Sequence, residues 1–113
     1  MAHLTQEDVQ CLLEQTYSGI ARERASAVRA LCPCQVKRNE PRVWNRVIEL
    51  ASDPDVKVRS QVLHVLADGS PRKRERQVVA AIETLTQDAD ESLRRRARKV
   101  LAEYRRSGSV NVL

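Results

Sequence analysis

The chain has 113 residues, which suffices for one domain with a single hydrophobic core and is too short for two independent domains. Apolar residues make up 42% and charged residues 31%, so the composition excludes a disordered or collagen-like chain. The net charge is +5, and residues 71–113 carry all of this excess. That asymmetry favours an anionic partner for the last third of the chain, although a modest net charge also serves solubility.

The core has to be built almost without aromatic side chains, because the chain has no Phe, one Trp and two Tyr. Leu, Val, Ile and Ala suit close helix-on-helix packing, which argues against a β-sandwich or a barrel. No stretch approaches the roughly 18 apolar residues of a membrane span, and the first residues lack the features of a signal peptide. Three cysteines, an odd number, argue against a disulfide framework. We therefore expect a cytoplasmic protein with no membrane partner.

The chain aligns with itself at an offset of 35 residues, in three copies. The positions that coincide include Arg24, Arg59 and Arg94; Leu31, Leu66 and Leu101; and the acidic pairs Asp53/Asp55 and Asp88/Asp90. Each copy has the pattern of a helix pair, so the sequence predicts an all-α repeat protein of about six helices.

The first pair is predicted at residues 5–16 and 20–31, separated by Tyr17-Ser18-Gly19. In the second pair, Pro41 occupies the first turn of a helix, where its missing N–H costs nothing, and Ser52-Asp53-Pro54-Asp55 ends that helix. Asp55 then caps a second helix, which Gly69-Ser70-Pro71 ends. In the second helix of the first pair the inward side chains are Ala21, Ala27, Val28 and Leu31. In the second helix of the second pair they are Val58, Val62, Val65 and Leu66.

The third pair has helices near 73–87 and 91–106, separated by Asp88-Ala89-Asp90. Its second helix turns inward Leu93, Ala97, Val100 and Leu101. Residues 107–113 break the helical pattern, and we expect them to form a flexible tail. Residues 1–106 then form a single domain with repeats at about 5–34, 41–70 and 73–106.

The segment from Asp53 to Gly69 resembles the second helix of HEAT repeats, particularly of the short bacterial HEAT-like type. The match begins with Asp53-Pro54-Asp55-Val56-Lys57-Val58-Arg59 and ends with Val65-Leu66-Ala67-Asp68-Gly69; a second copy begins with Asp88-Ala89-Asp90-Glu91-Ser92-Leu93-Arg94. The resemblance covers about residues 5–106 and implies a right-handed α-solenoid of three antiparallel helix pairs. For function it implies a scaffold or a binding surface, because HEAT-like repeats serve as adaptors, as accessory parts of bilin lyases and as DNA-repair glycosylases.

The repeated Asp and Arg residues are predicted to be structural. An Asp before a second helix accepts from its unpaired N–H groups, and an Arg four to six residues later pairs with that carboxylate or with its neighbour in the next repeat. By analogy with stacked repeats that contact only their neighbours, we assign this role to Asp53, Asp55, Asp88, Arg24, Arg59 and Arg94.

An Arg-rich strip is the main candidate for partner binding. At about 100° per residue, Arg95, Arg96 and Lys99 fall on the face of their helix away from its inward side chains. The resemblance implies that second helices line the concave surface of the stack. On that surface the strip is extended by Arg29, Lys57, Gln61 and His64.

The partner of this strip is predicted to be an acidic protein surface or peptide. Nucleic acid is the alternative, bound by the basic ranges 72–76 and 94–106, although no aromatic residues interleave the arginines to stack bases. A solvated basic face without a ligand explains much of the same charge. If the strip binds nothing, the first helices around Arg42 and Arg46 are the next candidate face.

Catalysis has few candidate groups, since the only histidines are His3, near the terminus, and His64, beside Asp68. No Gly-rich phosphate loop, HExxH pair or Gly-x-Ser-x-Gly elbow occurs. We therefore expect no enzymatic activity, no cofactor and no small-molecule substrate. An accessory subunit of a lyase or glycosylase would need a partner chain to supply the chemistry.

Cys32-Pro33-Cys34 is the one cluster with reactive atoms. It fits a metal site, a regulatory thiol or a plain turn with a half-buried Cys32, and the turn is favoured. Tetrahedral zinc needs four ligands, and only Cys11 and one of two histidines distant in sequence could assist. The sequence therefore predicts no metal site.

Overall fold

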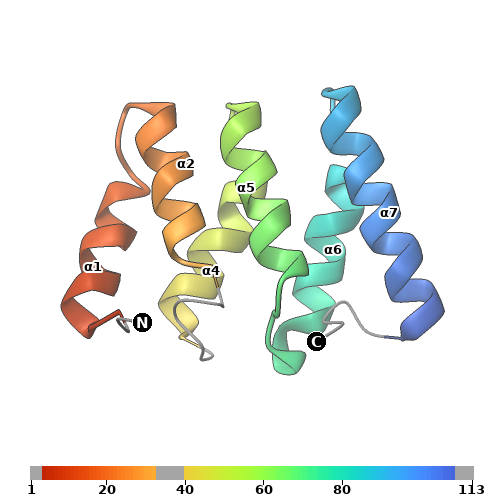
Figure 1. Cartoon of the computed structure of the whole chain (residues 1–113), viewed down its shortest axis with the longest axis horizontal. Helices are drawn as coiled ribbons and strands as arrows, with labels where there is room; N and C mark the ends of the chain where they lie inside the picture. Colours follow the sequence, from red (N-terminus) through yellow and green to blue (C-terminus); the bar gives the residue numbers. More distant parts are fainter. Residues whose placement is uncertain (1–3, 33–39, 109–113) are drawn as a thin grey trace.

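The computed structural model describes residues 4–32 and 40–108, and within these ranges all regular structure is helical. The elements are α1 (Gln6–Gln15), α2 (Ala21–Ala30), α4 (Pro41–Glu49), η1 (Leu50–Ser52), α5 (Val56–Ala67), η2 (Arg72–Arg74), α6 (Glu75–Leu85) and α7 (Glu91–Ser107). Figure 1 shows the helices side by side in one row, so that the molecule is a short α-solenoid. The predicted helices at 5–16, 20–31, 73–87 and 91–106 are present, with ends displaced by at most two residues.

The helices begin where the sequence provides caps. Thr5 and Asp8 form a capping box, in which each side chain accepts the other residue's backbone N–H, at 3.0 and 2.9 Å. Pro41 takes the first turn of α4, as predicted. The carboxylates of Asp55 and Asp90 cap α5 and α7 by accepting first-turn backbone N–H groups at 2.8 and 2.9 Å. The predicted capping role of Asp55 is confirmed.

The end of α7 lies one residue beyond its predicted position. The helix runs through Ser107, and Gly108 follows in the left-handed conformation, with φ of 75°. In this geometry Gly108 N donates to Tyr104 O at 2.7 Å. The rest of the predicted tail, residues 109–113, lies outside the described residues, as do His3 and the segment 33–39 with Cys34.

One hydrophobic core runs through the whole array. Helix α2 packs lengthwise on α5, and α6 packs on α7, so that each helix contacts the next repeat or its own partner. The predicted inward side chains of α5 are all buried: Val58, Val62, Val65 and Leu66. Those of α2 and α7 are buried too, apart from Ala21 and Val100, which are partly buried. Trp44 lies 2% exposed in the same core.

The array has two broad faces. The second helices α2, α5 and α7 lie on the near side in Figure 1, and the first helices α1, α4 and α6 lie behind them. The side chains of α2, α5 and α7 that point away from the core therefore share one surface, here called the second-helix face. Among the described residues, no helix combines the length and apolarity needed to cross a membrane.

Candidate binding surface

A ladder of Arg–Asp pairs connects consecutive repeats and positions the second helices. Arg24 donates from Nε and Nη2 to the two carboxylate oxygens of Asp53, at 2.9 and 3.1 Å. Arg59 holds Asp88 in the same bidentate geometry, at 2.8 and 3.1 Å. Both arginines also donate from Nη1 to the carbonyl oxygen six residues earlier, on Ser18 and Asp53 respectively, at 2.9 and 3.0 Å. The predicted structural role is confirmed for these two pairs, in which Arg24 and Arg59 each hold the Asp of the next repeat.

The two ladder carboxylates also fix the turns in which they lie. The backbone N–H of Asp55 donates to Asp53 at 2.9 Å, and that of Asp90 donates to Asp88 at 2.9 Å. Burial by itself raises the pKa of Asp53 and Asp88, but the hydrogen bonds from the arginine partner and the backbone outweigh it. The pKa of both carboxyls therefore lies below its ordinary value, and both side chains stay ionised.

Arg94 keeps only the part of this pattern that lies within its own repeat. Its Nη1 donates to Asp88 O at 2.8 Å, which matches the carbonyl contacts of Arg24 and Arg59. Among the described residues it forms no ion pair across repeats. Arg94 is partly buried in this turn, so it does not belong to the exposed strip that begins with the next residue.

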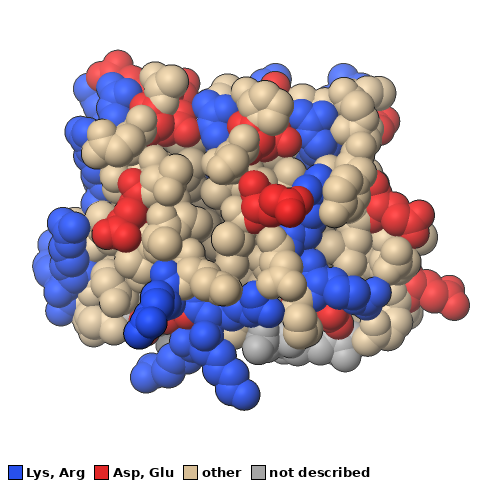
Figure 2. Space-filling model, turned by 180° about the vertical axis from the view of Figure 1, so that it is seen from behind, with Lys and Arg blue, Asp and Glu red and all other residues tan. Residues whose placement is uncertain are grey.

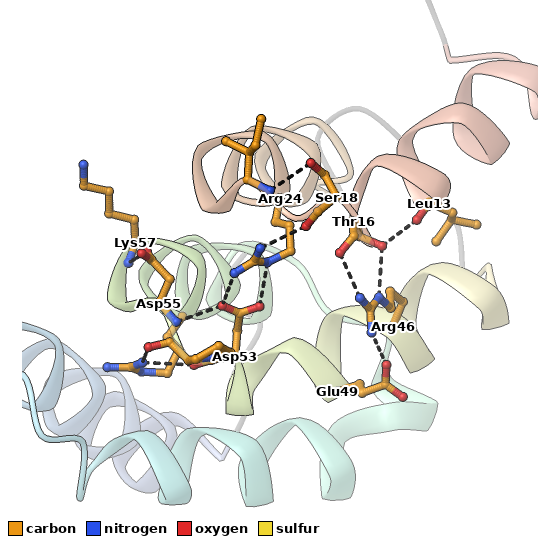
Figure 3. A network of polar contacts seen from close by, with 12 residues as sticks. Leu13, Thr16, Ser18, Arg24, Arg46, Glu49, Asp53, Asp55 and Lys57 are labelled. Carbon is orange, nitrogen blue, oxygen red and sulfur yellow. Dashed lines mark hydrogen bonds and ion pairs between the residues drawn. The ribbon is translucent and has the colours of Figure 1, made fainter.

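Arg42 and Arg46, the alternative candidates of the first helices, bridge α4 to α1. Arg46 donates to Thr16 Oγ1 at 2.9 Å and to Thr16 O at 2.8 Å, pairs with Glu49, and lies 3.7 Å from the ring centroid of Tyr17. Figure 3 shows the contacts of Arg46 with Thr16 and Glu49 beside the Arg24–Asp53 pair. Arg42 donates to the Gln10 side chain of α1 at 2.8 Å. These contacts give both arginines a role in packing the first two repeats.

The predicted strip on α7 is exposed. Arg95 pairs with Glu91 at 2.7 Å, where the two side chains are 74% and 64% exposed, so this pair adds little stability. Arg96 donates from Nη1 to Ser60 Oγ at 2.7 Å, which connects α7 to α5. Arg95, Arg96 and Lys99 line one shallow hollow together with Glu91.

The other predicted strip residues lie on the neighbouring second helices. Arg29 on α2, and Lys57 and His64 on α5, are exposed on the second-helix face. Gln61 differs, because it is partly buried and its Oε1 is shielded from solvent without a hydrogen-bond partner among the described residues. It is therefore less accessible to a partner than the sequence pattern implies.

A second hollow lies between α5 and α7 and brings two strip residues together. Leu63, Ala67 and Val100 contribute apolar surface to it, and the polar side chains that line it are His64, Asp68 and Arg96. Its volume is about 180 Å³. His64 of α5 and Arg96 of α7, both members of the predicted strip, therefore line the same hollow.

Cys32 has a different environment from the one that the sequence predicts. It is only 2% exposed, not half-buried, because it lies two residues after the end of α2 and is enclosed where α2 packs on α5. His64 is distant in sequence, yet its imidazole lies near the Cys32 sulfur, since the packing brings the ends of both helices together. Cys11, the helper that the sequence suggests, is exposed on α1. Of the two histidines that the sequence allows to assist Cys32, His64 is therefore the one that the packing brings to it.

The family of this chain is decided by how much of the chain a family model matches. A family model described as HEAT repeats matches residues 9–102, which is most of the chain. The chain belongs to the HEAT-repeat family. No curated protein and no solved structure matches it. HEAT repeats generally mediate protein–protein interaction, and the family is typically non-enzymatic.

The opposite face of this HEAT-repeat array carries a second basic cluster. Figure 2 shows that face, where Lys and Arg gather along the lower edge and Asp and Glu are spread over other parts. The basic residues at the start of α6 are Arg72, Lys73, Arg74 and Arg76, which line one hollow. Arg74 is partly engaged, because it donates to Asn45 Oδ1 at 2.6 Å.

Sequence reasoning missed one exposed apolar feature of the HEAT-repeat chain. Tyr17 and Ile20, in the turn between α1 and α2, are 70% and 52% exposed. The sequence places Tyr17 in a helix break and gives it no role. Tyr17 lies in a turn, outside the helical periodicity of the apolar residues. This position indicates exposure, because a core aromatic would fall on the inward face of a helix.

Proposed function

We propose that this HEAT-repeat chain is a non-enzymatic binding module and that an acidic protein segment docks on its second-helix face. The observation that carries the proposal is the exposed cationic strip of α7 beside the hollow between α5 and α7. The ladder residues Arg24 and Arg59 are saturated by buried carboxylates, whereas Arg95, Arg96 and Lys99 point outward. Exposed guanidinium groups favour carboxylate partners, which they bind in bidentate geometry.

The hollow supplies a place for an anchoring side chain. Leu63, Ala67 and Val100 contribute its apolar surface, and Arg96 lies at its edge. Binding energy at interfaces concentrates at such points, where an apolar group is desolvated beside a charged contact. A short array offers few of them, so we expect a partner segment with acidic residues around one apolar side chain.

The test uses charge reversal on the strip and a matched control on the same helix. Arg95→Glu plus Arg96→Glu alters the strip, and Arg105→Glu plus Arg106→Glu makes the same charge change at the end of α7, where Arg106 pairs with Glu103. We expect the strip variant to lose capture of the partner from native-host extract and the control to keep it, with the far-ultraviolet circular dichroism and melting temperature of both nearly unchanged. Equal capture by both variants contradicts the proposal.

A second variant tests whether the shape of the Arg96 guanidinium matters in addition to its charge. Arg96→Lys keeps the positive charge but loses the planar, bidentate donor set of the guanidinium. We expect weaker capture if Arg96 contacts a carboxylate of the partner, and unchanged capture if its charge acts only at a distance.

Nucleic acid is a second candidate, favoured by the exposed residues Arg72, Lys73 and Arg76 at the start of α6. Anisotropy titrations with duplex and single-stranded DNA at two salt concentrations test it. Micromolar binding that collapses as salt rises and disappears in Arg72→Glu plus Arg76→Glu supports this candidate. Binding that is absent, or unaffected by that variant, excludes this cluster as a nucleic-acid site.

A further inference from the structure

Three possible metal ligands meet where α2 packs on α5. Cys32 comes two residues after the end of α2, while His64 and Asp68 lie four residues apart on one side of α5, at its last turn and C-cap. One ligand atom from each of the three side chains lies within 4.8 Å of the other two. The sulfur is already in contact with the carboxylate, because Cys32 Sγ donates to Asp68 Oδ2 at 3.0 Å.

We propose that Cys32, His64 and Asp68 bind a zinc ion. A thiolate, an imidazole nitrogen and a carboxylate oxygen are the ligand types that zinc prefers. With bonds of about 2.0–2.3 Å, tetrahedral coordination places ligand atoms about 3.3–3.5 Å apart. His64 is exposed, so a change in its side-chain rotamer closes the remaining gap without disturbing the core.

The fourth coordination position is expected to face the hollow between α5 and α7, which His64 and Asp68 line. Three protein ligands and an open position leave room for water or for a ligand from outside the chain. The thiolate and the carboxylate balance the charge of the ion. Arg96 lines the same hollow, and its positive charge repels a cation there. Its Nη1 donates to Ser60, which lies one turn before His64 on α5. Arg96 therefore weakens zinc binding and favours an anionic fourth ligand.

The binding step exchanges a proton for the metal. Without zinc, the thiol proton of Cys32 lies on the hydrogen bond to Asp68. Zinc takes this place: the S–H bond breaks, the S–Zn bond forms with the sulfur electron pair, and one proton leaves to the buffer. No oxidation or reduction is involved. Since Cys32 belongs to the first repeat and the other two ligands to the second, the ion connects both repeats and stabilises the fold.

The experiment isolates the Cys32 thiol and uses cobalt as a spectroscopic probe. Cys11 is exposed on α1, and Cys34 lies outside the described residues. Replacing both with Ser leaves one thiol, so a thiolate-to-cobalt charge-transfer band in this background reports Cys32 alone. We expect one cobalt ion per chain, displaced by one zinc ion, with one proton released.

Further substitutions in this background test each ligand. Cys32→Ser is expected to abolish the charge-transfer band. His64→Asn and Asp68→Asn are expected to weaken zinc binding by at least the ~10–100-fold typical of lost supporting contacts. Arg96→Gln is expected to tighten it. Far-ultraviolet circular dichroism checks that the variants fold, and His64→Asn keeps the test valid if Cys32→Ser does not, because His64 is exposed.

Two results overturn the proposal. The first is a background protein that shows no thiolate-to-cobalt band at one equivalent of cobalt. The second is a His64→Asn variant that binds zinc as tightly as the background and gains the same rise in melting temperature from it. Neither result depends on any partner of the second-helix face.

Discussion

Removal of Arg59 tests the ladder at the point where two repeats meet. Its guanidinium makes two bonds to Asp88, at 2.8 and 3.1 Å, and donates to the carbonyl oxygens of Asp53 and Pro54, at 3.0 and 3.1 Å. The Arg59 and Asp88 side chains are only 16% and 7% exposed. Arg59→Ala therefore leaves an ionised carboxylate enclosed between α5 and the turn before α7 without its main counterion.

The magnitude follows from this burial. Breaking a buried ion pair by removing one partner costs about 3–5 kcal/mol, because the remaining charge is uncompensated. The nearby charge of Arg94 and the residual solvent contact of the pair reduce this value, so we expect Arg59→Ala to lower the free energy of unfolding by about 3 kcal/mol. With a slope of about 2 kcal/mol per molar urea, the unfolding midpoint falls by about 1.5 M.

Arg94→Ala is the matched control, because Arg94 makes the carbonyl contact of the ladder without the ion pair across repeats. We expect it to cost about 1.5 kcal/mol, the lower end of the range for a hydrogen bond that involves a charged group. Urea titrations followed by circular dichroism measure both variants. If Arg59→Ala costs no more than Arg94→Ala, the ion pair between repeats does not stabilise the array and the reasoning fails.

Two further predictions concern the core and the acid limb of the stability curve. Leu66 is 0% exposed between repeats, so Leu66→Ala should lower the free energy of unfolding by about 2–5 kcal/mol. Urea titration measures this loss, and a loss within the error of the titration would contradict the assigned packing. Since the pKa of Asp53 and Asp88 lies below its ordinary value, their stabilisation is complete at neutral pH and is lost as pH falls below about 4 toward the folded-state pKa. Unfolding titrations between neutral and acid pH should show this loss, and Asp53→Asn plus Asp88→Asn should flatten it; an unchanged slope would refute the assignment.

The fold was predictable from the sequence because several local patterns agree. The apolar positions repeat with helical period, Pro41 and Asp55 mark helix starts, and the 35-residue offset shows how many units there are. The sequence did not decide whether each Arg pairs with the Asp of its own repeat or with the Asp of the next repeat. That choice depends on how far one repeat is displaced along the next, which local patterns do not contain.

The Cys32 cluster escaped prediction because its members belong to different repeats. Cys32 and Asp68 are 36 residues apart, and the same separation joins Arg96 to Ser60. In a solenoid, positions about one repeat apart lie on adjacent helices, so each residue meets those near its own equivalent in the next copy. Applied to Cys32, this rule leads to the end of α5, where Asp68 lies. The repeat length alone could therefore have identified the contact between Cys32 and Asp68.

The basic run at the start of α7 illustrates why charge counts do not locate a binding surface. Arg94 and Arg95 are neighbours, yet Arg94 is partly buried and its guanidinium donates to Asp88 O, whereas Arg95 is exposed and pairs with Glu91 on its own helix. The difference arises because successive residues of a helix point about 100° apart, and only one direction faces the turn of the same repeat. Neighbouring arginines of one helix thus differ in burial and in contacts according to the direction in which they point.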